Sequence, residues 1–307
     1  MRKTSLDWVE KLAIQDARVI FIGSDLGFGT LDQMKANFPE RFFMEGVSEQ
    51  HIVGMAAGLA MEGFIPFINT IATFLTRRCF EQVCLDLCLH DLPVRLIANG
   101  GGCVYAPLGP THLAIEDLAI MRSLPNMTVV APCDADEMGR LMQHTLKWPH
   151  PIYIRLAKGG DEIVSEAALG FEIGKGINLR EGKEVLLVST GIMAQRGLRI
   201  SEALDSMGIS TGLLHLHTLK PLDTSVLLEK ARSKKLIVTL EEHSKIGGLG
   251  SAVLESINDF AAGPMPPVLR FGLSDQFIEN YGSQDQLLDH QGLSVEKLTK
   301  NILNYFR

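Results

Sequence analysis

The chain has 307 residues, of which 46% are hydrophobic and 21% are charged, and its formal net charge is −7. These values are typical of a soluble globular protein, and the charges form no basic block of the kind that nucleic-acid binding requires. No apolar run reaches the roughly 18 residues of a membrane span, and the acids within the first turns of MRKTSLDWVEKLA argue against a signal peptide.

Helix and strand signals alternate through the first half of the chain. Short apolar segments predict strands at 18–23, 41–46, 64–69, 93–99, 128–132 and 151–156. Apolar residues at helical spacing predict helices at 4–15, 48–61, 74–90, 114–124 and 134–148. This alternation is typical of an α/β fold with a parallel sheet covered on both faces.

A change in composition divides the chain near its middle. The stretch 158–184 is rich in glycine and charge, so we expect a domain at 1–165, a linker at 166–183 that could hold a hairpin, and a second domain at 184–307. A second alternating block then predicts strands at 185–191, 210–218, 236–243 and 267–273, and helices at 195–208, 225–235, 245–260 and 295–306.

The five cysteines, at positions 79, 84, 88, 103 and 133, are odd in number and match no zinc spacing. Three of them fall on one predicted helix. We therefore expect reduced, buried thiols, no metal ligands, and a cytoplasmic protein.

Four candidate groups follow the predicted strands, where parallel sheets bind their ligands. They are Glu49, Phe74 with Arg77, His112 and Arg155. Each also has a plain structural interpretation: a solvated helix-capping acid, a core aromatic, a structural histidine and a surface charge, respectively.

The glycine-rich stretch KIGGLGS (245–251) precedes a predicted helix, as phosphate-binding loops do. The third glycine of GxGxxG would stand at 253, which is valine, and no Lys-Ser/Thr pair follows. A structural tight turn is the better interpretation.

Taken in order, several stretches resemble thiamine-diphosphate enzymes of the transketolase family. GVSEQHIVGMAAGLAMEGFIPFINTIATFLTRRCFEQV (46–83) and GPTHLAIEDLAIMRSLPNMTVVAPCDADE (109–137) resemble its pyrimidine-binding domain. LLHLHTLKPLD (213–223) and LEEHSKIGGLGSAV (240–253) resemble its C-terminal domain. The details are most similar to transketolase and to deoxyxylulose-phosphate synthase.

The resemblance implies a role for the first candidate residues in holding the cofactor. Glu49 would bond a ring nitrogen of the aminopyrimidine, and an apolar site would favour its sharing a proton there. The ring could then activate the thiazolium carbon that attacks a ketose carbonyl. Phe74 would stack on the pyrimidine, and Arg77 stands where the synthase carries an arginine.

The resemblance also implies substrate-binding residues. His112 matches a histidine that faces the substrate or the intermediate, and Arg155 matches an arginine that binds the substrate phosphate. Arg2 lies where transketolases place another phosphate-binding arginine, 23 residues before Asp25.

Three positions depart from the transketolase pattern. Leu108 stands where an aspartate reads a substrate hydroxyl, and Gly100 and Gly29 replace a phosphate-contacting histidine and a serine. Losing the partner of a hydroxyl redirects substrate choice. We therefore expect a modified, deoxy or branched sugar and not the ordinary pentose phosphates.

The sequence contains no Gly-Asp-Gly motif, which in this family binds magnesium and diphosphate. We therefore expect the C-terminal subunit of a split transketolase, active with an N-terminal partner subunit in a heterotetramer, with thiamine diphosphate between the two and Mg²⁺ held mainly by the partner. The alternatives are a beta subunit of an oxo-acid dehydrogenase, a synthase of the deoxyxylulose-phosphate type, and a non-enzymatic homodimer.

Overall fold

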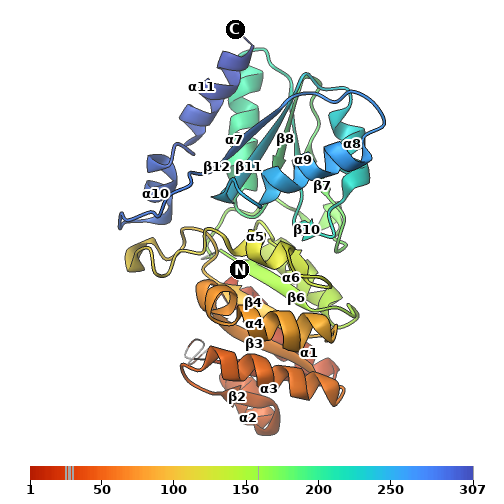
Figure 1. Ribbon diagram of the computed structural model, residues 1–307, viewed down its shortest axis with the longest axis vertical. Helices are drawn as coiled ribbons and strands as arrows, with labels where there is room; N and C mark the ends of the chain where they lie inside the picture. Colours follow the sequence, from red (N-terminus) through yellow and green to blue (C-terminus); the bar gives the residue numbers. More distant parts are fainter. Residues whose placement is uncertain (25, 27–28, 30, 158, 307) are drawn as a thin grey trace.

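The computed structural model describes residues 1–24, 26, 29, 31–157 and 159–306. Two sheets lie one above the other, the first built mainly from the N-terminal half of the chain and the second from the C-terminal half (Figure 1). Helices cover both, which confirms the α/β class.

The first sheet has the strand order β10-β5-β6-β4-β3-β1-β2. Its strands are β1 Val19–Gly23, β2 Phe42–Met44, β3 Ile65–Ile71, β4 Arg95–Asn99, β5 Thr128–Val130, β6 Ile152–Leu156 and β10 Thr218–Lys220. All pairs are parallel except β10 with β5. Its helices include α1 Arg2–Gln15, α2 Asp32–Asn37, α3 Glu49–Met61, α4 Phe80–Gln82, α5 Asp117–Arg122 and α6 Ala135–Thr145.

Alternation along β1 shows how both faces of this sheet are buried. Ile20 and Ile22 pack into the core beneath α3, whereas Val19 and Phe21 pack into the core beneath α1 and α6. Successive strand residues point to opposite faces, so a strand covered by helices on both sides becomes continuously apolar.

The second sheet has the order β12-β11-β8-β9-β7, parallel except for β7 with β9. Its strands are β7 Ile177–Arg180, β8 Val185–Ser189, β9 Thr211–His215, β11 Leu236–Ser244 and β12 Val268–Leu273. Its helices are α7 Met193–Ser206, α8 Thr224–Ala231, α9 Leu249–Phe260, α10 Gln284–His290 and α11 Val295–Tyr305.

The predicted segments differ from the structure in several places. The helix expected at 74–90 is wound partly as π-helix, at Phe74–Arg78 (η2) and Val83–Leu89 (η3), on either side of α4. The strand expected at 210–218 leaves the second sheet after β9 and enters the first as β10. The short helices α2 and α10 were not predicted, although Ser283 and Gln286 form a capping box for α10.

Two strands do not follow the proposed division into domains. β7 lies within the expected linker 166–183, and β10, from the proposed second domain, pairs with β5 of the first sheet. A buried side-chain contact joins the same two parts: His215 Nε2 lies 3.1 Å from Glu137 Oε2. Burial alone would raise the pKa of Glu137, but His215 outweighs it and lowers that pKa to about 2. The proposed domains are therefore joined by backbone pairing and by a buried contact between a histidine and a carboxylate.

We expect the stability of the protein to fall as pH decreases from about 6.5 to about 4, because of His217. Burial lowers the pKa of this imidazole to about 4 from its usual 6.5, so within this window the unfolded chain binds a proton that the folded chain does not. The full effect is up to about 3 kcal/mol. Urea unfolding at several pH values gives the free energy of unfolding as a function of pH. This dependence on pH should be weaker in His217→Gln than in wild type, and an exposed control, His290→Gln, should keep the wild-type dependence. If the free energy of unfolding of His217→Gln depended on pH as strongly as that of wild type, His217 would not be the cause of the loss.

Candidate functional site

Glu49 is the first residue of α3, and its side chain is only 1% exposed. Its Oε2 accepts a hydrogen bond from Arg78 Nη1 at 2.6 Å, whereas its Oε1 is buried and has no partner among the described atoms. Among the described atoms, Arg78 is the partner of this carboxylate, which makes no capping bond to the backbone of α3. Burial excludes the interpretation as a solvated capping acid and leaves one carboxylate oxygen available to a ligand.

Two aromatic rings extend the contact between Glu49 and Arg78. The guanidinium carbon of Arg78 is 4.3 Å from the centroid of the Phe74 ring, and the ring of His112 lies 5.4 Å from the same centroid. Phe74 begins the π-helical segment η2, a type of turn found mostly at functional sites. We call Glu49, Phe74, Arg78 and His112 the Glu49 cluster; its members span 63 positions of the chain, and the sequence had singled out three of them.

Arg77 and Arg78 point to different partners. Arg77 Nη2 donates to the carbonyl oxygen of Leu113 at 2.9 Å, and its Nε pairs with Glu116. It thus holds the segment that follows His112, whereas Arg78 contacts Glu49. Consecutive helical residues point about 100° apart, and the π-turn changes that angle again, so the sequence did not show which arginine would face the carboxylate.

We expect Arg78→Met to lower the free energy of unfolding by about 1–3 kcal/mol, because it leaves both oxygens of a buried carboxylate without a partner. Arg77→Met should cost less than about 1 kcal/mol, since its pair with Glu116 is about one-third exposed on each side. Urea unfolding measures both. Adding Glu49→Gln to Arg78→Met should recover part of the loss, and purely additive effects would contradict the pairing.

Arg155 is buried, and its Nε and Nη2 are bonded to protein groups. Its Nε donates to Asp117 Oδ2 at 2.9 Å, and its Nη2 donates to the carbonyl oxygens of Ala114 and Glu242 at 3.1 and 2.8 Å. Burial alone would lower the pKa of Arg155, but Asp117 and Glu242 outweigh it and raise that pKa. The interpretation as a surface charge is therefore wrong. Phosphate binding by Arg155 stays a prediction, and its present bonds stabilise the segment after His112.

Arg2 makes no contact with the Glu49 cluster among the described contacts. It begins α1, which packs on the face of the first sheet opposite to α3, and its Nε is buried without a partner among the described atoms. Asp25, the reference point for its assignment, lies outside the described residues. Phosphate binding by Arg2 also stays a prediction.

The glycine at position 100 has a structural reason. Its φ is +80°, and a Cβ there would lie 2.1 Å from the ring of Tyr105, which itself sits 6.4 Å from the His112 ring. The ring of Tyr105 thus occupies the space that a side chain at 100 would need. Leu108, at the expected hydroxyl-reading position, is 49% exposed.

A buried group of potential metal ligands was not predicted. Cys133, Glu137 and His215 place one ligand atom each within 4.8 Å of one another. Their polar atoms already bind each other: Glu137 Oε2 accepts from the Cys133 backbone N–H at 2.7 Å and lies 3.1 Å from His215 Nε2. All five cysteines are free, as expected, and all but Cys84 are buried.

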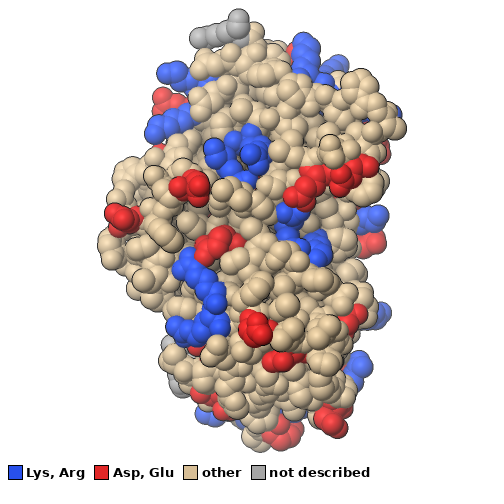
Figure 2. All heavy atoms as spheres, in the orientation of Figure 1, with Lys and Arg blue, Asp and Glu red and all other residues tan. Residues whose placement is uncertain are grey.

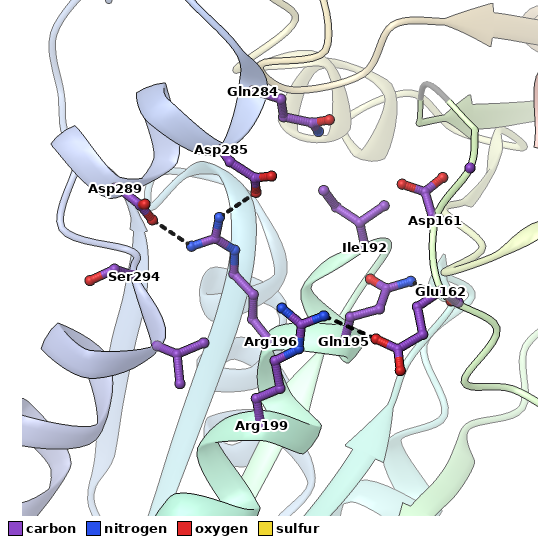
Figure 3. A pocket seen from close by; sticks show the side chains of 12 residues that line it. Asp161, Glu162, Ile192, Gln195, Arg196, Arg199, Gln284, Asp285, Asp289 and Ser294 are labelled. Atoms are coloured by element: carbon purple, nitrogen blue, oxygen red, sulfur yellow. Dashed lines mark hydrogen bonds and ion pairs between the residues drawn. The ribbon is translucent and has the colours of Figure 1, made fainter.

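A cavity of about 540 Å³ lies away from the Glu49 cluster, between the loop at 160–162 and helices α7, α10 and α11. Five of its charged side chains pair with one another: Arg196 lies between Asp285 and Asp289, and Arg199 contacts Glu162 (Figure 3). On the face seen in Figure 2, basic and acidic side chains are interspersed. Within the described residues, no helix has the length and apolar character needed to cross a bilayer.

Known proteins match the chain along nearly its whole length. Residues 1–160 match the transketolase pyrimidine-binding domain, and residues 174–298 match the transketolase C-terminal domain. A protein of Methanocaldococcus jannaschii described as a transketolase C-terminal section is 36% identical, over 99% of this chain and 95% of that protein. The 1-deoxy-D-xylulose-5-phosphate synthase of Microcystis aeruginosa is 36% identical over 96% of this chain, which spans 46% of that enzyme.

Solved structures match in the same way. A split-gene transketolase, described as an inactive beta4 tetramer, superposes with a TM-score of 0.90 at 36% identity, covering 99% of this chain and 97% of that one. A transketolase of Pichia stipitis superposes with a TM-score of 0.78 at 18% identity, and this chain covers 45% of it. From these matches and the order of its two sheets, the chain belongs to the transketolase family and carries its pyrimidine-binding and C-terminal domains.

Proposed function

We propose that this chain is the C-terminal subunit of a two-component transketolase, which transfers a two-carbon ketol unit from a ketose or ketose-phosphate donor to an aldose acceptor in carbohydrate metabolism. The observation that supports this most strongly is the Glu49 cluster, where a buried carboxylate, a phenyl ring and an imidazole meet on the pyrimidine-binding domain. The family assignment supports thiamine diphosphate as cofactor, and we place the protein in the cytoplasm.

The described residues fit the aminopyrimidine half of thiamine diphosphate. The unpartnered Glu49 Oε1 is a buried acceptor that a protonated ring nitrogen can satisfy, and the Phe74 ring offers a face for stacking. When bound, the cofactor supplies a nucleophilic carbon that forms and breaks the bond next to a ketose carbonyl.

Each residue of this chain has a task in that reaction. Glu49 holds or shares a proton at its free oxygen, where burial makes an unshared charge costly. Phe74 orients the ring. His112, whose Nδ1 lies 2.9 Å from Thr111 Oγ1, faces the same space and can donate or accept a proton at a substrate hydroxyl. Arg78 neutralises Glu49 at its other oxygen.

An N-terminal partner subunit is part of this proposal. The chain has no Gly-Asp-Gly motif, so the partner would hold Mg²⁺ and the diphosphate, in a heterotetramer of two chains of each kind. Two findings support a partner: the relative described as a C-terminal section, and the solved split-gene relative, which is described as an inactive tetramer of beta chains.

The substrate proposal follows from the loop beside His112. Leu108 is half exposed and apolar where a hydroxyl would be read, and Tyr105 closes the space at Gly100. Both features favour a deoxy, modified or branched sugar. A synthase of the deoxyxylulose-phosphate type is the second candidate, supported by 36% identity to such an enzyme over 96% of the chain.

The test combines the purified chain with a transketolase N-terminal subunit, which is a chain that bears Gly-Asp-Gly and a downstream asparagine. With thiamine diphosphate and Mg²⁺, ketose donors plus aldehydes should give chain-extended ketoses without loss of CO₂. CO₂ release from pyruvate with an aldehyde acceptor would favour the synthase, and CO₂ release with acyl transfer to a lipoyl group would favour an oxo-acid dehydrogenase. No product with any donor would contradict the proposal.

A further inference from the structure

Three consecutive titratable residues at the end of β11 are buried, and they serve different partners. Glu241 accepts hydrogen bonds from the backbone N–H groups of Leu249 and Gly250, at 2.7 and 2.9 Å, and so caps α9 within its own domain. Glu242 and His243 instead reach the pyrimidine-binding domain, where His243 Nε2 accepts from the backbone N–H of Ala119 at 3.2 Å. None of the three belongs to the Glu49 cluster.

The Glu242 carboxylate holds the start of the loop that carries His112. Its Oε1 accepts from the Cys103 backbone N–H at 2.8 Å and from Gln284 Nε2 at 2.8 Å. Gly102 permits this approach, because a Cβ at that position would lie 2.4 Å from the Glu242 carboxyl carbon. The backbone carbonyl of Glu242 also accepts from Arg155 Nη2.

The loop is closed at its base, directly beside this contact. Gly102 and Ala114 exchange two backbone hydrogen bonds, of 2.9 and 3.0 Å, so residues 103–113 form a loop with both ends fixed. We call residues 103–113 the His112 loop. Its base lies on Glu242, and its side chains of Tyr105 and His112 reach the Phe74 ring or each other.

Gln284, the second donor to Glu242, is itself fixed. It begins α10, and Arg196 of α7 anchors that helix by donating to Asp285 at 2.7 Å, to Asp289 at 2.9 Å and to the carbonyl oxygen of Leu293 at 2.8 Å (Figure 3). The position of the Glu242 carboxylate is therefore set by the C-terminal domain on one side and used by the His112 loop on the other.

We propose that Glu242 is a positioning residue, through which the C-terminal domain sets the His112 loop over the Glu49 cluster. The claim that Glu242 positions the loop stands on the structure alone. The claim that this positioning matters for catalysis rests on the proposed function. By this account the C-terminal domain contributes to transfer without Glu242 touching the reacting groups.

The test is hydrogen–deuterium exchange on the full chain, with Glu241 as matched control. Glu242→Leu should raise exchange in peptides covering 103–113 by about tenfold or more, as expected for losing a hydrogen bond to a buried charge. It should leave α9 unchanged. Glu241→Leu should raise exchange at the start of α9 and leave exchange in 103–113 unchanged. Glu242→Gln has a side-chain carbonyl that can accept both bonds, so its exchange in 103–113 should stay within about twofold of wild type.

If Glu242→Leu does not fold, Gln284→Leu replaces it and should raise exchange in 103–113 several-fold. Unchanged exchange there, or an equal rise over the whole first domain, would overturn the proposal. In the assembled enzyme with thiamine diphosphate and Mg²⁺, Glu242→Leu should lower kcat more than cofactor affinity, and Glu242→Gln should restore it. If the wild-type assembly catalyses no transfer, the proposed function fails, and the exchange result still decides the role of Glu242.

Discussion

Replacing Glu49 by glutamine is expected to lower turnover by about 100-fold or more, the usual contribution of a positioned proton donor or acceptor. Glutamine keeps the shape of the side chain and a carbonyl oxygen for the 2.6 Å bond from Arg78, so the fold should persist. It cannot share a carboxyl proton with a ring nitrogen. Steady-state kinetics of the chain combined with its partner, at saturating thiamine diphosphate, measures the loss.

The control for this variant is Glu45→Gln, an exposed acid four residues before Glu49 that should retain wild-type turnover. Circular dichroism and urea unfolding of both variants would show that the fold is intact. If Glu49→Gln kept full turnover, Glu49 would have no part in proton sharing, and the proposed chemistry of the Glu49 cluster would be wrong.

Arg155→Met should destabilise the protein by about 3–5 kcal/mol, because it leaves the buried carboxylate of Asp117 without its cation. Both side chains are at most 5% exposed, and Tyr153 Oη also donates to this carboxylate at 2.8 Å. Urea unfolding gives the change directly. Arg199→Met is the matched control, since its pair with Glu162 is 61% exposed on both sides and should contribute less than about 1 kcal/mol.

This second variant also separates two roles of Arg155. A purely substrate-binding arginine would leave the unfolding free energy near that of wild type and raise KM for a phosphorylated donor. The bonds to Asp117, Ala114 and Glu242 instead predict a loss of stability even in the absence of substrate. A loss below about 1 kcal/mol would contradict the structural role.

Much of the fold could be predicted because burial imposes a readable pattern. β1 is buried on both faces and is therefore apolar throughout, and the neighbouring helices carry apolar residues at helical spacing. The segment 210–218 shows the limit of this pattern. A strand signal does not reveal where the chain changes sheets, because that depends on partners in β5 that lie about 90 residues earlier.

Part of the candidate site could also be predicted from the sequence. Glu49, Phe74 and His112 were singled out from strand ends and from family resemblance, and the structure brings them together. Arg78 and Glu242 were not predicted as site residues, because their roles depend on which way a π-turn directs a side chain and on a contact between residues 103 and 242. Neither is visible in local sequence.

The most direct test of the central claim is the exchange of the cofactor C2 proton with D₂O, followed by NMR after rapid acid quench. Thiamine diphosphate and Mg²⁺ are mixed with this chain and its Gly-Asp-Gly partner. We predict fast exchange only when both chains are present, and slow exchange, near that of the free cofactor, when this chain carries Glu49→Gln. Equally fast exchange with wild type and Glu49→Gln, or with the partner alone, would contradict the account.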